Sequence, residues 1–169
     1  MLRRPFLTIA VALVSVVALA AAGCGVGTQH TSTAGKHAKR PVVLRQASLA
    51  VGAYHRFIWI PARAGKLFGP VSPAVSQGAA AAQFAYRELK LAARNAEHNK
   101  RLWSLFAAME VTADKLKALG AALSDHPSLA EIESVNGVLN RIAATAKQDG
   151  HRIIDATPAQ IAAAGGPRA

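Results

Sequence analysis

Apolar residues recur along this chain at steps of three and four positions, the spacing typical of amphipathic helices. Four such stretches are predicted, at residues 42–60, 73–96, 102–123 and 128–149, and a short helix follows before residue 165. The alternation of apolar and polar residues that marks a half-buried strand does not occur over a useful length.

The expected core positions follow the helical period, and they are Val43, Ala47, Ala50, Tyr54, Phe57 and Ile58, then Ala82, Ala85, Tyr86, Leu89, Ala93 and Ala96, then Leu102, Leu105, Phe106, Met109, Ala113, Leu116, Leu119 and Leu123, and finally Ile132, Val135, Leu139, Ile142 and Ala146. On the first helix, Arg45, Ser48, Gly52 and Arg56 are placed on the opposite, polar side. Narrow apolar faces are buried most economically against one another. The pattern predicts an all-α fold, an antiparallel four-helix bundle with a flexible N-terminal tether and a short C-terminal helix.

Local signals mark several helix boundaries. Pro61 is expected to end or kink the first helix, because proline lacks the N–H that a helix interior needs. Ser128 and Glu131 have the spacing of a capping box at the start of the fourth helix. A turn is expected near His98, although one continuous helix over residues 73–123 is the alternative.

The amino terminus has the pattern of an export signal. Arg3 and Arg4 form a positive start, residues 6–22 carry no charge, and small residues lead up to Cys24. A positive start, an apolar stretch and small residues at the cleavage point define a removable signal peptide. Residues 1–23 are therefore predicted to be cut off.

The sequence Ala21-Ala22-Gly23-Cys24 resembles the lipobox of bacterial lipoproteins, although that motif prefers leucine where this chain has Ala21. The resemblance implies that Cys24 carries diacylglycerol, that the new amino terminus receives a fatty acid such as palmitate, and that the protein is held on the outer face of the bacterial cytoplasmic membrane. Cys24 is the sole cysteine, so no intramolecular disulfide can form. No cofactor other than this covalent lipid is expected.

Three other interpretations of the amino terminus stay open. An ordinary secretory signal would be cut near the alanines, and about seventeen apolar residues come close to the length of an uncleaved membrane anchor. A buried N-terminal helix of a cytoplasmic protein is the third. Under the lipoprotein interpretation, residues 24–41 form a flexible basic linker with a reach of roughly 20–25 Å, residues 42–164 form the helical domain, and residues 165–169 form a tail.

Charge is unevenly distributed along the exported part. From Cys24 to Arg87 the chain has eight basic residues and no acidic one, whereas ten basic and nine acidic residues follow. Lys and Arg beside an anionic membrane surface attract its head groups by about 1 kcal/mol each. The expected partners are therefore anionic lipids or acidic envelope polymers, and nucleic acid is excluded as a partner for an exported, anchored domain.

Aromatic and basic residues are concentrated between Tyr54 and Lys66. The candidate contact residues for a partner or a membrane are Arg56, Trp59, Arg63, Lys66 and Phe68. The competing interpretation makes the segment the best-packed part of the core, with its arginines extending outward. Residues 54–66 and 84–90 resemble small secreted helical proteins of high-GC Gram-positive bacteria, a resemblance that assigns no functional residue.

Catalytic signatures are absent: the chain has no nucleophile elbow, no zinc-binding helix motif and no phosphate-binding loop. Glu110 and Asp114 share a helix face and are expected to face solvent beside Lys117. The histidines are dispersed, so no metal site is predicted. The expected function is a non-catalytic binding or structural module of the cell envelope with an unidentified protein partner, and the alternative is a carrier of a small apolar ligand or lipid within the bundle.

Overall fold

The computed structural model describes residues 40–68, 72–125 and 128–168, and this part of the chain contains helices and no strand. The predicted signal peptide and Cys24 lie outside it. The elements are α1 (Arg40–Tyr54), the π-helix η1 (His55–Trp59), α2 (Ile60–Arg63), α3 (Pro73–Glu97), the 3₁₀ turn η2 (Lys100–Leu102), α4 (Trp103–Ala122), α5 (Leu129–Gln148) and α6 (Pro158–Ala163). No helix within these ranges has both the length and the apolar character that a membrane span requires.

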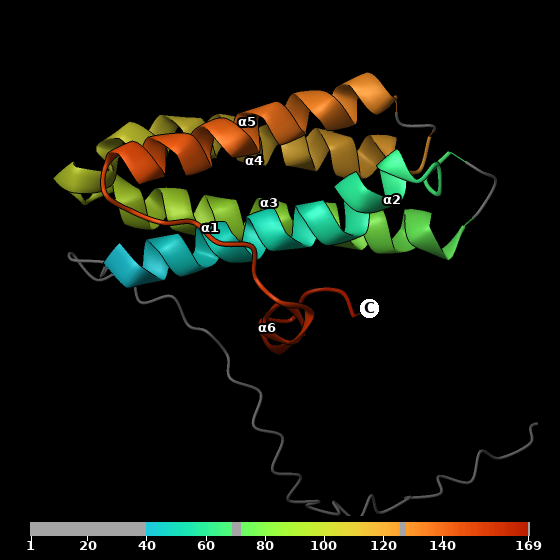
Figure 1. Cartoon of the computed structure of the whole chain (residues 1–169), viewed down its shortest axis with the longest axis horizontal. Helices are drawn as coiled ribbons and strands as arrows, with labels where there is room; N and C mark the ends of the chain where they lie inside the picture. Colours follow the sequence, from blue (N-terminus) through green and yellow to red (C-terminus); the bar gives the residue numbers. More distant parts are fainter. Residues whose placement is uncertain (1–39, 69–71, 126–127, 169) are drawn as a thin grey trace, which may run out of the picture. The chain divides into compact units, whose positions relative to one another are not determined.

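Neighbouring helices pack with opposite chain directions. α3 packs against α1 and α4, and α5 packs against α4 and η1 (Figure 1). Asn95, near the end of α3, donates a hydrogen bond to Gln46 in the first half of α1, and Ser104 at the start of α4 donates one to Asp149 after α5. We call the end with Arg40 and η2 the proximal end (left in Figure 1) and the end with α2 the distal end.

The core lies where the helical period places it. Every expected core position is buried except Tyr86 and Phe106, which are half-buried. Large side chains such as Leu116, Leu139 and Ile142 have no exposed surface. Burying each such side chain contributes about 1.5–3 kcal/mol, so these faces supply most of the stabilising free energy.

α1 is buried on two sides, and the expected polar side is wrong at Gly52. The chain after α5 returns along α1, where Ala156 donates its N–H to the carbonyl oxygen of Ser48 at 3.2 Å. A Cβ on Gly52 would lie 2.5 Å from the nitrogen of Ala156, so the two backbones can approach only because residue 52 is glycine. The helical period of α1 identifies its inner face but contains no information on this second partner.

Of the two effects expected of Pro61, the structure excludes the end of the helix at this residue. The N–H of Ile60 bonds to the carbonyl oxygen of His55, five residues earlier, which makes the preceding turn a π-turn. A proline ring clashes with the carbonyl four residues before it. The extra residue in the wider turn provides room for that ring, and the chain continues as α2 to Arg63.

Two other boundary predictions are decided by the structure. Residues 73–123 form two helices, α3 and α4, separated by a break in which the Asn99 side chain accepts a hydrogen bond from the N–H of Arg101 at 3.1 Å. The capping box at the start of α5 is confirmed, because Ser128 and Glu131 each bond to the other's backbone N–H.

Candidate functional site

The candidate contact residues from the sequence gather at the distal end of the helical unit. Arg56 and Trp59 lie on η1, Arg63 ends α2, and Lys66 and Phe68 lie in the turn that follows. All five are exposed except Trp59, which is half-buried and packs against the core. The arrangement is therefore a surface of mixed aromatic and cationic character.

Part of this surface is already occupied by contacts within the chain. The Arg63 guanidinium lies 5.7 Å from the centroid of the Trp59 ring, and its Nη1 is 3.8 Å from Oε1 of Glu133 on α5. Phe57 and Ile58 are buried, as the competing interpretation requires. The segment thus contributes to the core on one side and has exposed side chains on the other.

His55 connects three parts of the fold. Its Nδ1 is 2.7 Å from Oδ2 of Asp155 in the C-terminal segment, and its Nε2 is 3.1 Å from Oδ1 of Asn136 on α5. A general base or a metal ligand needs a ring nitrogen whose lone pair is free to meet a substrate or an ion. Because both nitrogens of His55 already have partners, the role of this cluster is structural. It joins η1, α5 and the segment that follows α5.

A pocket of about 460 Å³ lies between α1 and the C-terminal segment. Its lining includes Arg45, Ser48 and Leu49 of α1, and Ile154, Asp155 and Gln160 across from them. The pocket lies outside the interhelical core, and the apolar ligand of the alternative prediction is expected inside that core. Its lining is mixed in character, because a cation, a carboxylate and aliphatic side chains share it.

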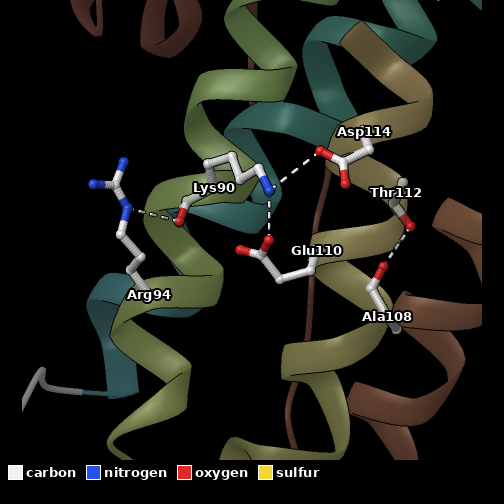
Figure 2. A network of polar contacts seen from close by, with 6 residues as sticks. All are labelled: Lys90, Arg94, Ala108, Glu110, Thr112 and Asp114. Carbon is white, nitrogen blue, oxygen red and sulfur yellow. Dashed lines mark hydrogen bonds and ion pairs between the residues drawn. The ribbon is translucent and has the colours of Figure 1, made fainter. Parts of the chain in front are cut away.

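A second polar cluster joins α3 to α4 (Figure 2). Lys90 Nζ lies 2.5 Å from Oε2 of Glu110 and 3.2 Å from Oδ1 of Asp114, one helical turn further along α4. Asp114 is exposed, as expected, whereas Glu110 is half-buried, and the basic partner of both carboxylates is Lys90 and not Lys117. The hydrogen bond that Lys90 donates to Glu110 raises the pKa of Lys90 above its ordinary value, although desolvation opposes that shift.

Replacing Lys90 by methionine is expected to lower the free energy of unfolding by about 1 kcal/mol at neutral pH. The substitution keeps the aliphatic length but leaves the carboxylates of Glu110 and Asp114 to repel each other. The measurement is urea denaturation followed by circular dichroism. A double-mutant cycle with Glu110→Gln should give a coupling free energy of about 0.5–1 kcal/mol that decreases in high salt, and additive effects would contradict the pairing.

One aromatic pair at the surface was not among the predicted contact residues. Trp103 opens α4 at the proximal end with 57% of its surface exposed, and its ring stacks on Phe106 at a centroid distance of 5.2 Å. The sequence contains one signal that could have identified this pair: two aromatic residues lie about one helical turn apart, shortly after Lys100 and Arg101. The helical period places Phe106 on the core face, and Trp103 lies beside that face.

The described residues include no group of three or more His, Cys, Asp or Glu side chains placed to hold a metal ion. No known protein-family model, curated protein or solved structure matches this chain. The function is therefore argued from the residues themselves.

Proposed function

We propose that this chain is the precursor of a bacterial lipoprotein that is anchored through lipid on Cys24 to the outer face of the cytoplasmic membrane. The observation that supports the anchor is the order of three features along the chain. Arg3-Arg4 comes first, an uncharged apolar run follows, and Ala21-Ala22-Gly23 stands directly before the sole cysteine. Each part has a separate physical task in export and cleavage. The thiol is then the single attachment point.

We propose further that the exported domain is a non-catalytic binding or structural module of the cell envelope. The polar clusters of the described residues support a structural role, because both nitrogens of His55 have partners and Glu110 and Asp114 share Lys90. The excess of basic over acidic residues favours anionic lipids or acidic envelope polymers as partners.

We infer that α1, α3, α4 and α5 form an antiparallel four-helix bundle that is extended by α6. The packing of α3 on both α1 and α4, and of α5 on α4 and η1, supports this arrangement. A helical bundle has two ends, where the helices begin and end, and a lateral surface formed by the outer faces of the helices. Its ends are therefore the natural surfaces to compare for contact with a membrane.

Replacing Cys24 by serine is expected to abolish lipid attachment. In a bacterial host with lipoprotein-processing enzymes, the natural chain should incorporate radiolabelled palmitate and sediment with membranes, because its cysteine thiol carries the acyl chains. The Cys24→Ser chain should take up no label, since a serine hydroxyl cannot replace the thiol in this modification.

The matched control moves the thiol while keeping the amino-acid composition identical. A Cys24→Ser, Ser32→Cys double variant should stay unlabelled, because the small residues that precede Cys24 no longer adjoin the cysteine. Labelling of the Cys24→Ser chain, or a natural chain that carries no acyl group, would overturn the proposed anchor.

A further inference from the structure

An aromatic pair at the proximal end has one exposed and one half-buried ring. Trp103 is 57% exposed at the first position of α4, and its ring stacks on the half-buried Phe106 with an interplanar angle of 23°. Tryptophan at a protein surface is enriched where one side of the ring meets hydrocarbon and the other meets water, as at a lipid head-group layer. The pair has the chemistry of an interfacial contact.

The two ends of the helical unit differ in charge. We compare, among the described residues, the terminal turns of the long helices and the turns that adjoin them. The proximal end has five basic and two acidic side chains, namely Arg40, Arg94, Lys100, Arg101 and Lys147 with Glu97 and Asp149. The distal end has two of each, namely Arg63 and Lys66 with Asp125 and Glu131. Only the proximal end therefore has a surplus of positive charge beside its exposed aromatic pair.

The covalent connection to Cys24 also enters at the proximal end. Arg40 begins α1 there, and its guanidinium contacts the ring of His151 just after α5. Cys24 precedes Arg40 by sixteen residues, and the flexible linker predicted there has a typical reach of roughly 20–25 Å. The distal end lies a further 24 helical residues away, or roughly 36 Å along the helix axis. An anchor on Cys24 thus favours the proximal end as the surface nearest the membrane.

We propose that the proximal end docks on a bilayer that contains anionic phospholipid, with Trp103 and Phe106 at the head-group level and Lys100, Arg101 and Arg94 beside the phosphates. This proposal rests on the proposed function for the anchor, which brings the domain to the membrane. The proximal end replaces the surface around Trp59 as the proposed membrane contact. The distal end has equal numbers of basic and acidic side chains, and it lies farther from the tether. Each basic side chain near the surface adds to the attraction, and the aromatic rings add an apolar contact.

The two tryptophans of the chain allow a direct test, because they are at opposite ends of the helical unit. In full-length chains, Trp59→Phe leaves Trp103 as the sole tryptophan and Trp103→Phe leaves Trp59. Each chain is added, both as the natural Cys24 form and as Cys24→Ser, to vesicles of phosphatidylglycerol and phosphatidylcholine in equal amounts with brominated acyl chains. Trp103 emission should shift to shorter wavelength and fall at least about twofold, whereas Trp59 emission should stay unchanged.

A charge comparison provides the matched control. In the Cys24→Ser background, Lys100→Gln with Arg101→Gln should weaken binding to these vesicles by about tenfold to thirtyfold. Arg63→Gln with Lys66→Gln removes the same charge from the distal end and should leave binding nearly unchanged. Helical circular dichroism checks that every variant is folded.

The outcomes separate this proposal from that of the anchor. Quenching of Trp59 instead of Trp103, equal quenching of both, or an anchored chain with neither quenched would overturn proximal docking. A natural chain that carries no lipid while Cys24→Ser still binds through Trp103 would overturn the anchor and leave the docking surface supported. Equal loss of binding in the two double-glutamine variants would show that net charge alone, and not this surface, attracts the membrane.

Discussion

Replacing Tyr54 by alanine is expected to lower the free energy of unfolding by about 3–5 kcal/mol. Tyr54 is fully buried on α1, and its hydroxyl donates a hydrogen bond to the carbonyl oxygen of Ile132 on α5 at 2.5 Å. The substitution removes a large apolar group from the core and a side-chain hydrogen bond that joins α1 to α5. Domains of this size have total stabilities of about 5–15 kcal/mol, so urea denaturation should show a much earlier transition.

Two further variants separate the contributions of ring and hydroxyl. Tyr54→Phe keeps the ring and should cost about 1 kcal/mol, the net value of one hydrogen bond. Tyr86→Ala removes the same side chain from a half-buried position and should cost clearly less than Tyr54→Ala. Equal effects of the two alanine variants would contradict the burial of Tyr54.

The same hydroxyl predicts how stability changes in alkali. Burial, together with the nearby charge of Glu133, raises the pKa of Tyr54 far above its ordinary value. The folded state then retains a proton that the unfolded state releases above about pH 10. The contribution of Tyr54 to the free energy of unfolding is therefore fully present below that pH, and it decreases as the pH rises above it. The decrease should be smaller in Tyr54→Phe, as denaturation at pH 7 and at alkaline pH would show.

Replacing Gly52 by alanine is expected to destabilise the protein by about 1–3 kcal/mol. The new Cβ would lie 2.5 Å from the nitrogen and 2.7 Å from the oxygen of Ala156, and backbone atoms cannot rotate away as a flexible side chain can. The C-terminal segment must therefore move off α1. Hydrogen exchange should become faster for the N–H groups of Ile154 and Ala156, which bond to Ser48.

Gly137 on α5 is the matched control, because nothing lies within 4 Å of a Cβ added there. Gly137→Ala should stabilise the protein by about 0.5–1 kcal/mol, since alanine loses less backbone entropy than glycine in a helix. Opposite signs for the same chemical change would identify close backbone packing as the cause. Destabilisation by both variants, or unchanged exchange in Gly52→Ala, would contradict the contact with Ala156.

Local patterns predicted the helices and most of the core correctly. Apolar periodicity identified the buried positions of α4 and α5, because a helix with one apolar stripe has a single favourable orientation toward its neighbours. The break near His98 and the capping box at Ser128 were also recognisable, since both depend on residues only a few positions apart. The proposed anchor at Cys24 belongs to the same class of local inference, and it stays a prediction.

Interactions between distant residues were not predictable in this way. Lys90 is twenty residues from Glu110, and His55 is one hundred residues from Asp155. Periodicity within one helix contains no information on which partner meets its other side, so the second buried side of α1 was missed. The candidate surface around Trp59 was chosen from composition, which could not show that Trp103 is the more exposed tryptophan.

By itself, the sequence determined the helical class and the core faces, and it predicts an export-type amino terminus, because each follows from residues that are neighbours along the chain. Only the tertiary structure decided that Pro61 is accommodated by a π-turn, that Gly52 meets Ala156, and that the proximal end combines exposed aromatic rings with a surplus of positive charge. The physical reason is that packing and surface charge depend on which segments meet in space. That information is distributed over the whole chain and not contained in any one stretch of it.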